Sequence, residues 1–198
     1  MSDLKLDNKY WDNRYTQNDF PWDVGFASPS IIDYFSTLEN KELKILFPGA
    51  GNGREAAEIY KMGFLNVHIL DYAPTPIQNF INANPSFPST QIYCVDFFSH
   101  NNKYDLIVEQ TFFCALNPEL REKYVKKMVD LLNNEGKLVG LMFGVPMNLD
   151  KPPFGGNENE YRSLFEKKFN NTTMKPCENS VTRRAGSELW VEMSLSEK

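Results

Sequence analysis

The chain has 198 residues, of which 41% are hydrophobic and 14% aromatic, and its formal net charge at pH 7 is −5. This composition is typical of a soluble globular protein, so it excludes a disordered chain and predicts one domain over residues 1–198 with one buried core. The negative net charge opposes a large phosphate-binding face, and we therefore expect no nucleic-acid partner.

No stretch reaches the roughly 18 apolar residues of a membrane span, and residues 1–5 lack the apolar core of a secretory signal. The three cysteines, Cys94, Cys114 and Cys177, lack the spacing of a disulfide framework or a zinc site. We expect Cys94 and Cys114 to be small buried residues rather than nucleophiles. These features predict a reducing cytoplasmic location, no metal, no membrane partner and a monomer.

The N-terminal segment is predicted to hold two helices. Residues 7–15 form a short helix, and a loop rich in aromatic residues occupies 16–27. The pair Ser28-Pro29 begins a second helix, because serine caps a helix start and proline fits its first turn. An apolar stripe follows this pair, so we expect the second helix to pack against the core.

From residue 43 onward, strands and helices alternate. Such alternation predicts a mainly parallel sheet with helices on both faces. The predicted strands lie at 43–47, 67–70, 91–95, 105–109 and 137–143. The predicted helices lie at 54–62, from Thr75 to just before the Asn84-Pro85 turn, and from Asn117 through Leu132 to a stop at Gly136.

The C-terminal part begins with a loop over 144–157, which has many prolines and glycines and is predicted to form a lid or pocket wall. A helix around Tyr161 follows. The last two strands, 172–177 and 188–195, lack a helix-length connection, so we expect an antiparallel hairpin. The sequence therefore predicts a Rossmann-like α/β fold, with a mainly parallel seven-stranded sheet and an antiparallel C-terminal hairpin.

A glycine-rich turn, Gly49-Ala50-Gly51-Asn52-Gly53, follows the first strand of the alternating region. Glycine is required where the backbone turns tightly and approaches a ligand, because a Cβ atom would occupy that space. Asp71 ends the next strand, at roughly the 20-residue separation from the turn that is expected for a carboxylate accepting hydrogen bonds from ribose hydroxyls. Together these features predict a βαβ unit built around a nucleoside.

The spacing of the glycines indicates which nucleoside binds. A dinucleotide site has the pattern G-x-G-x-x-G, which directs a helix N-terminus at a pyrophosphate. This chain has G-x-G-x-G followed by Arg54, which fits a nucleoside with an amino-acid tail and no phosphate, namely S-adenosylmethionine. A nicotinamide or flavin site, and a glycine turn without a ligand, remain as alternatives.

The ends of later strands supply further candidate residues, because ligands of such sheets bind beyond the carboxyl ends of the strands. Asp96 can accept the adenine amino group, while Phe97 offers its backbone N–H or its ring. The alternative is that Asp96 only caps a turn. Glu109-Gln110 ends the following strand, so we expect it at the same carboxyl-end edge of the sheet as Asp71 and Asp96.

The two histidines do not lie where a catalytic base is expected. His68 falls inside a strand and His100 in a polar loop, so we interpret both as structural or solvent-facing. If the ligand is S-adenosylmethionine, its chemistry is methyl transfer from a sulfonium, which depends mainly on aligning the two reactants, a contribution that can reach about 7 to 11 kcal/mol. We therefore assign no general base.

Six motifs occur in order between about Lys9 and Pro153. They are Tyr10-Trp11-Asp12-Asn13-Arg14-Tyr15, Pro21-Trp22-Asp23-Val24-Gly25, Phe47-Pro48-Gly49-Ala50-Gly51-Asn52-Gly53, Asp96-Phe97-Phe98, Tyr104-Asp105-Leu106-Ile107 and Thr111-Phe112-Phe113-Cys114-Ala115-Leu116-Asn117-Pro118-Glu119-Leu120-Arg121. Together they resemble the thiopurine S-methyltransferase family, close to its bacterial and plant thiol and halide methyltransferase members. The glycine turn is common to methyltransferases, whereas the aromatic block and the Phe-Phe-Cys-Ala segment are specific to this family.

The resemblance implies a class I S-adenosylmethionine-dependent methyltransferase in which residues 1–40 cover the cofactor and the substrate. It assigns the methionine tail to Gly49, the ribose to Asp71 and the adenine to Asp96 and Phe97. The implied cofactor-binding residues are Trp11, Tyr15, Trp22, Gly49, Gly51, Asp71, Asp96, Phe97 and Gln110. The expected substrate residues are Phe20, Trp22, Phe112, Phe113 and Arg184.

Three positions depart from the family pattern. Tyr15 stands where plant members usually have tryptophan, Ala50 where cysteine is frequent, and Gln110 where an aromatic residue is frequent. We expect these changes to affect substrate preference more than cofactor binding.

The expected substrate pocket is mostly apolar. Such a pocket favours a small, soft nucleophile over a large polyanion, because burying an unpaired charge is costly. We therefore expect methyl transfer to a thiol, hydrosulfide, halide or thiopurine. Two alternatives remain at this point, a non-catalytic S-adenosylmethionine-binding protein and a dinucleotide-dependent oxidoreductase.

Overall fold

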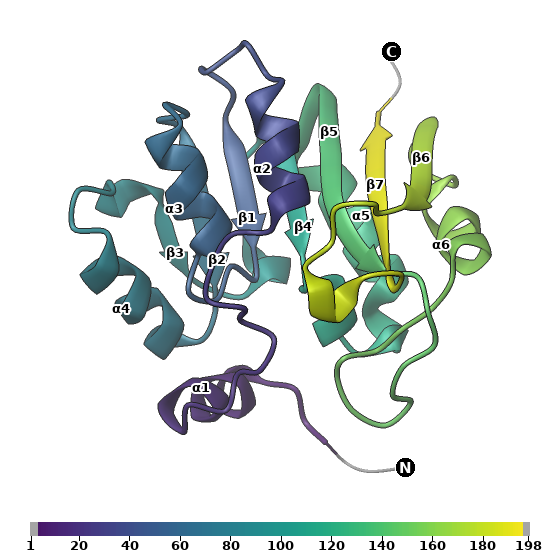
Figure 1. Cartoon of the computed structure of the whole chain (residues 1–198), viewed down its shortest axis with the longest axis horizontal. Helices are drawn as coiled ribbons and strands as arrows, with labels where there is room; N and C mark the ends of the chain where they lie inside the picture. The colour runs from purple at the N-terminus through teal and green to yellow at the C-terminus, as the bar shows by residue number, and fades with distance from the viewer. Residues whose placement is uncertain (1–3, 196–198) are drawn as a thin grey trace.

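A seven-stranded sheet runs through the centre of the structure (Figure 1), a computed structural model that describes residues 4–195. The strand order is β3-β2-β1-β4-β5-β7-β6, in which β1 to β5 are parallel and β7 pairs antiparallel with both β5 and β6. The predicted fold class is thereby confirmed. The strands are β1 (Ile45–Pro48), β2 (Val67–Asp71), β3 (Ile92–Cys94), β4 (Tyr104–Gln110), β5 (Leu132–Phe143), β6 (Asn171–Pro176) and β7 (Glu188–Ser194).

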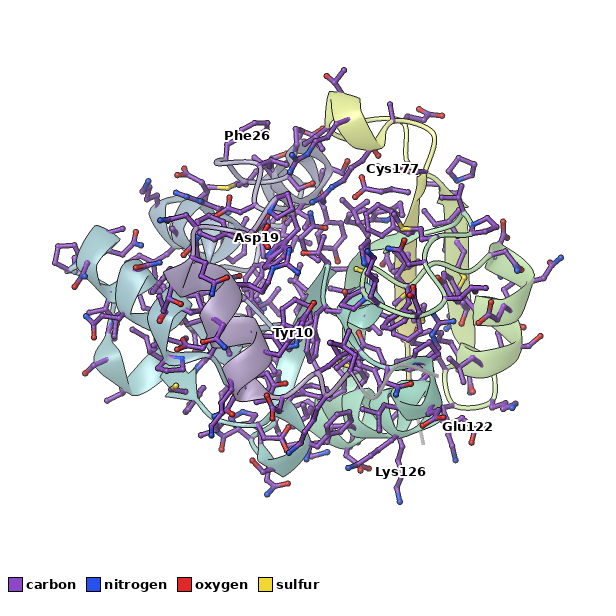
Figure 2. The ribbon with its side chains drawn as sticks, turned by 90° about the horizontal axis from the view of Figure 1, so that it is seen from below. Tyr10, Asp19, Phe26, Glu122, Lys126 and Cys177 are labelled. Carbon is purple, nitrogen blue, oxygen red and sulfur yellow. The ribbon has the colours of Figure 1, made fainter. Side chains whose placement is uncertain are left out.

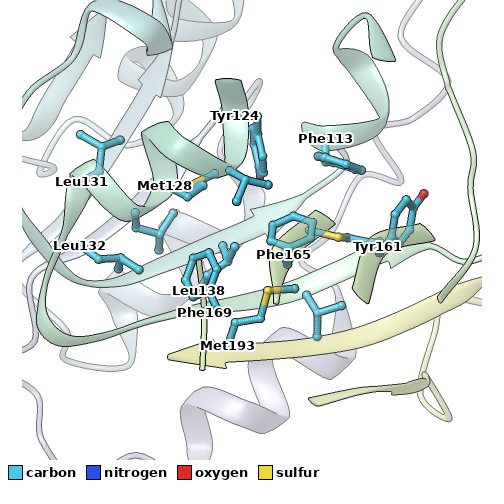
Figure 3. Close-up of a cluster of buried hydrophobic side chains, with 14 of the residues drawn as sticks. Phe113, Tyr124, Met128, Leu131, Leu132, Leu138, Tyr161, Phe165, Phe169 and Met193 are labelled. Carbon is cyan, nitrogen blue, oxygen red and sulfur yellow. The ribbon is translucent and has the colours of Figure 1, made fainter. Parts of the chain in front are cut away.

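Helices cover both faces of this sheet, and the pleat decides which side chains meet them. Ile45 and Phe47 pack on one face with residues of α2, α3 and α4, whereas Leu46 packs on the other with residues of α5 and α6. Figure 3 shows part of the second core, where Met128 and Phe165 meet side chains of the sheet. The helices are α1 (Asn8–Thr16), α2 (Pro29–Ser36), α3 (Arg54–Lys61), α4 (Pro74–Ala83), α5 (Arg121–Leu131) and α6 (Glu158–Phe165).

The parallel strands end at the lower edge of the sheet in Figure 1, and α1 lies beyond this edge. Asp7 caps α1 by accepting the backbone N–H of Tyr10 at 3.0 Å. Asp12 of α1 accepts the N–H of Thr75, at 2.8 Å, from the start of α4. Figure 2 views the molecule from this side, with Tyr10 near the centre. The N-terminal segment therefore lies over the end of the sheet where a ligand is expected.

Two predicted features differ from the structure. The helix predicted to continue through Leu132 to a stop at Gly136 ends at Leu131, and β5 begins at Leu132, which pairs with Tyr104, rather than at Lys137. Cys94, expected to be buried, is exposed because β3 is a short strand at the edge of the sheet. Cys114 is buried as predicted.

None of the helices within residues 4–195 has the length and apolar character that crossing a bilayer requires. The predicted domain of 1–198 and its covering segment of 1–40 include positions 1–3 and 196–198, which lie outside the described residues.

Candidate active site

A cavity of about 900 Å³ opens at the carboxyl ends of the parallel strands. The glycine turn and the ends of β2 and β4 form one side of it. The N-terminal segment, part of the loop over 144–157 and the turn before β7 form the other. Cavities of this size and mixed lining are typical of small-molecule sites.

The glycine turn is packed so closely that Gly49 and Gly51 have no room for a Cβ atom. A Cβ atom at Gly51 would lie 2.4 Å from the hydroxyl oxygen of Tyr15, and one at Gly49 would lie 2.2 Å from the ring of Phe112. Both glycines have positive φ, 54° and 60°, which alanine adopts only at a cost. The turn predicted from the sequence therefore meets the N-terminal aromatic block from one side and the end of β4 from the other.

Asp71 lies at the end of β2 beneath this turn, and it is 8% exposed. One carboxylate oxygen accepts the N–H of Gly51 and the other that of Ala73, both at 2.9 Å. Burial raises the pKa of Asp71, against the opposing effect of these donors. Each oxygen keeps acceptor capacity for a further donor, as a ribose hydroxyl requires. Asp71 also holds the turn itself, a role that its position in the sequence did not indicate.

Three N-terminal aromatic residues, Trp11, Tyr15 and Trp22, line the cavity together. The Trp22 indole N–H donates to the Tyr15 hydroxyl at 3.2 Å, and the Trp11 and Trp22 rings meet edge to face at 5.5 Å. The Arg14 guanidinium lies 4.9 Å from the Trp22 ring centroid, within the range of a cation–π contact. Phe20 stacks on Tyr15 at 5.1 Å and is absent from the cavity wall, so it supports Tyr15 from behind.

Asp96 and Phe97 both line the cavity after β3. Asp96 accepts the N–H of Phe98 at 3.0 Å, so its side chain caps a turn while its position remains open to a ligand. Gln110 lines the cavity at the end of β4, and its Oε1 atom is buried without a hydrogen-bond partner. The structure thus brings all nine expected cofactor residues to one cavity.

Phe112 and Phe113 are neighbours in the sequence but occupy different environments. Phe112 lines the cavity, whereas Phe113 is 1% exposed and packs in the core against Tyr124 and Tyr161 (Figure 3). Both rings meet Tyr124, with centroids 6.0 and 5.0 Å from it, but of the two only Phe112 lines the cavity. The prediction that Phe113 contacts substrate is therefore wrong.

Arg184 lines the cavity, as expected from the sequence, and two of its five N–H donors are engaged within the protein. Its guanidinium donates to the carbonyl oxygen of Trp22 at 2.7 Å and pairs with buried Glu188 at 3.3 Å. Arg183 donates to the carbonyl oxygen of Pro21. Both arginines thus hold the backbone of the N-terminal segment, and a second Glu188 oxygen is buried without a partner.

Neither histidine lines the cavity. His68 contacts Asn66 at 2.9 Å, and His100 contacts the Tyr104 hydroxyl at 2.7 Å. Burial lowers the pKa of His68 to about 4, so this ring is neutral at pH 7. The described part of the chain also contains no cluster of metal-ligating side chains. These contacts agree with the structural interpretation of both histidines.

The fold also brings to the site several residues whose contacts the sequence did not indicate. Asp23 accepts hydrogen bonds from Asn52 at 2.7 Å and from Arg54 at 3.3 Å, which fastens the aromatic segment to the glycine turn. Glu109, at the end of β4, is buried just behind the cavity wall, and Cys114 lines the cavity. The motif containing Asp23 was recognised, but its partner is too distant in sequence to be inferred.

The solved structures that resemble this fold include the magnesium protoporphyrin IX methyltransferase of Synechocystis with bound S-adenosylmethionine. It superposes with a TM-score of 0.73 and 13% sequence identity over 99% of this chain and 100% of that chain. At this identity the likeness shows the fold. The strand order, glycine turn and strand-end carboxylate define the Rossmann-like fold of S-adenosylmethionine-dependent methyltransferases.

Sequence comparison narrows this class. Residues 6–193 match the family described as thiopurine S-methyltransferase (TPMT). The probable thiol methyltransferase 2 of Arabidopsis thaliana is 28% identical over 162 residues, which cover 78% of this chain and 70% of that protein. The thiocyanate methyltransferase 1 of Brassica oleracea is 26% identical over 184 residues, covering 90% and 81%. The chain belongs to the thiopurine S-methyltransferase family and is an S-adenosylmethionine-dependent methyltransferase enzyme.

Proposed function

We propose that the chain binds S-adenosylmethionine in the cavity at the strand ends and methylates a small, soft nucleophile there. The acceptor class comprises thiols, hydrosulfide, halides and thiopurines. The observation that carries the proposal is the contact of Asp71 with Gly51, which unites the ribose acceptor and the glycine turn beneath an aromatic cover. Relatives named as thiol and thiocyanate methyltransferases support the acceptor class.

The residues of the cavity fit this cofactor. Gly49 and Gly51 line the cavity, and because neither has a side chain, the backbone of the turn can lie directly against a ligand. Asp71 retains acceptor capacity for ribose hydroxyls. Gln110 offers a buried amide oxygen that has no partner within the protein, so a ligand ammonium or amide can satisfy it. The nine cofactor residues remain a proposal at the level of individual contacts.

The chain's own residues align the reactants and exclude water. S-adenosylmethionine supplies, when bound, both the methyl group and the leaving group. Asp71 and the glycine turn orient the nucleoside, and Trp11 and Trp22 form an aromatic wall that attracts a cationic centre by about 0.5 to 2 kcal/mol per ring. Phe112 closes the wall on the β4 side. Alignment of this kind is the main contribution that such a displacement needs from the protein.

The acceptor side of the cavity favours a nucleophile that needs little deprotonation. Neither histidine reaches it, and Cys114 is unsuited as a proton acceptor because burial raises the pKa of its thiol to about 12. A thiol with an ordinary pKa near 8.5 is already a few per cent thiolate at neutral pH. The guanidinium groups of Arg183 and Arg184 each donate to a backbone carbonyl oxygen. Apolar side chains such as Trp22, Phe112 and Phe143 line the same cavity and suit a polarisable sulfur or halide.

Two measurements test the proposal. Calorimetry should detect binding of S-adenosylmethionine and of S-adenosylhomocysteine, and no binding of either at millimolar concentration would refute cofactor use. A panel of hydrosulfide, a small thiol, iodide and a thiopurine should then release S-adenosylhomocysteine, with the Asp71→Asn variant as a matched control of weakened cofactor binding. Turnover only with a catechol, amine or carboxylate would refute the soft-nucleophile class while leaving methyl transfer intact.

We further propose that the protein acts as a single-domain monomer in a reducing cytoplasm. Three free cysteines, Cys94, Cys114 and Cys177, support the reducing location. Sedimentation of the purified protein with and without S-adenosylhomocysteine tests the oligomeric state.

A further inference from the structure

Glu109 is an ionisable residue buried behind the cavity wall, with 1% of its surface exposed. One carboxylate oxygen accepts the backbone N–H groups of Phe112 and Phe113, each at 2.8 Å, and the other accepts the hydroxyl of Tyr124. Burial raises the pKa of Glu109 to about 7, and these donors oppose the rise. A buried carboxyl is tolerated when its oxygens are satisfied in this way.

Thr111, which lies between Glu109 and these donors, is strained. Its φ is 57°, in the left-handed region that a β-branched residue rarely adopts. The two N–H bonds to the Glu109 carboxylate close the backbone across this residue. Strained backbone persists where surrounding contacts determine it, and here the carboxylate supplies those contacts.

The turn held by Glu109 presents Phe112 to the cofactor side of the cavity. The Phe112 ring occupies the space that a Cβ atom at Gly49 would need, at 2.2 Å from its ideal position. The same ring meets Phe97 edge to face, with centroids 5.1 Å apart. Phe112 therefore touches both the glycine turn and the residue that follows β3.

We propose that Glu109 is a positioning residue for the cofactor site: its carboxylate fixes the turn over residues 111–113, and Phe112 in turn supports the glycine turn. Glu109 is absent from the cavity wall, so it acts through Phe112. The inference rests on the proposed function, because it concerns the S-adenosylmethionine site. This positioning role differs from proton transfer, because both oxygens of Glu109 are engaged by the protein.

A double-mutant cycle of Glu109→Ala and Phe112→Ala tests this, with S-adenosylhomocysteine titrated by calorimetry into variants that unfold cooperatively. Each single substitution should raise Kd about tenfold, and the pair should also raise it only about tenfold, because both remove the same support. Independent residues would give about a hundredfold increase, which would overturn the inference. An unchanged Kd for folded Glu109→Ala would overturn it as well.

Two conservative variants separate positioning from a general structural role. Glu109→Gln keeps an amide oxygen for the two N–H donors, so Kd should stay within about threefold of wild type. Tyr124→Phe removes only the donor to the other carboxylate oxygen, and Kd should again change by less than about threefold. In Glu109→Ala, the KM for S-adenosylmethionine should rise about tenfold with a smaller change in kcat. A fall in kcat alone would contradict positioning of the cofactor.

Should Glu109→Ala fail to fold, the cycle is run in a Thr111→Gly background, because glycine adopts the positive φ without strain. There the coupling between positions 109 and 112 should persist, and its absence would overturn the inference. Wild-type protein that does not bind S-adenosylhomocysteine would refute the proposed function itself. Normal wild-type binding with uncoupled variants would refute only the role of Glu109.

Discussion

Replacing Gly51 by alanine tests whether the glycine turn and the N-terminal aromatic residues form one packed unit. The φ of 54° costs an alanine about 1 to 2 kcal/mol. The new Cβ would lie 2.4 Å from the Tyr15 hydroxyl oxygen, so the ring must move and its bond from Trp22 is lost, which adds about 1 kcal/mol. We expect Gly51→Ala to lower the free energy of unfolding by about 2 to 3 kcal/mol.

Two controls divide this loss into strain and contact. Gly63 also has a positive φ, 92°, but a Cβ there meets no atom within 4 Å, so Gly63→Ala measures backbone strain alone. Tyr15→Phe removes the hydroxyl that a Cβ atom at position 51 would meet. In that background, Gly51→Ala should cost about 1 kcal/mol less than in wild type.

Urea unfolding followed by tryptophan fluorescence supplies the four free energies of the cycle. Equal losses for Gly51→Ala and Gly63→Ala, together with no coupling to Tyr15, would refute the packing of the aromatic residues on the turn.

Three further predictions concern buried charges. Asp71→Ala should weaken S-adenosylhomocysteine binding by about 1 to 3 kcal/mol in calorimetry and also lower stability, because two buried N–H donors lose their acceptor; full stability would contradict this. The pKa of Glu109 is raised from 4.5 to about 7 in the folded state, so its contribution to the free energy of unfolding should fall by about 3 kcal/mol as pH rises from 4.5 to 7. In urea titrations, the stability of Glu109→Gln relative to wild type should therefore increase over this pH range. A difference that stays constant with pH would refute the raised pKa. Arg184→Met should lower the free energy of unfolding by about 3 kcal/mol because buried Glu188 loses its partner. Arg183→Met should lower it by less than about 1 kcal/mol, and equal urea midpoints for the two variants would disprove this difference.

Local patterns predicted most of the fold, because they reflect the period of each element. The apolar runs of β1, β2 and β4 are buried on both faces and are readable without partners. The helix boundary predicted near Leu132 was wrong because local patterns do not decide it. Leu131 and Leu132 both suit an apolar helix face, and pairing of Leu132 with Tyr104 decides where the strand begins. That pairing depends on residues distant in sequence.

The same distinction applies to the site. The glycine turn and Asp71 are predictable because a strand, a turn and a carboxylate at fixed spacing determine their relative positions. The different environments of Phe112 and Phe113 are not predictable, because a carboxylate and a short turn set the backbone there rather than a helical or strand period. Phe20 likewise is an apolar aromatic residue of the kind expected in a pocket, but it stacks on Tyr15 behind the cavity wall.

In the proposed function, the N-terminal aromatic segment both covers the cofactor and borders the acceptor, and its attachment uses several separate contacts. Toward the glycine turn, Ser28 donates its backbone N–H to Glu55 at 3.0 Å. Toward the acceptor side, Arg183 and Arg184 bind backbone carbonyl oxygens, including that of Trp22. Because these anchors use the main chain of the segment, the Trp22 side chain is left to face the cavity. Under the proposed function, we therefore expect a substitution of the Trp22 side chain to change acceptor preference while these main-chain anchors keep the segment attached.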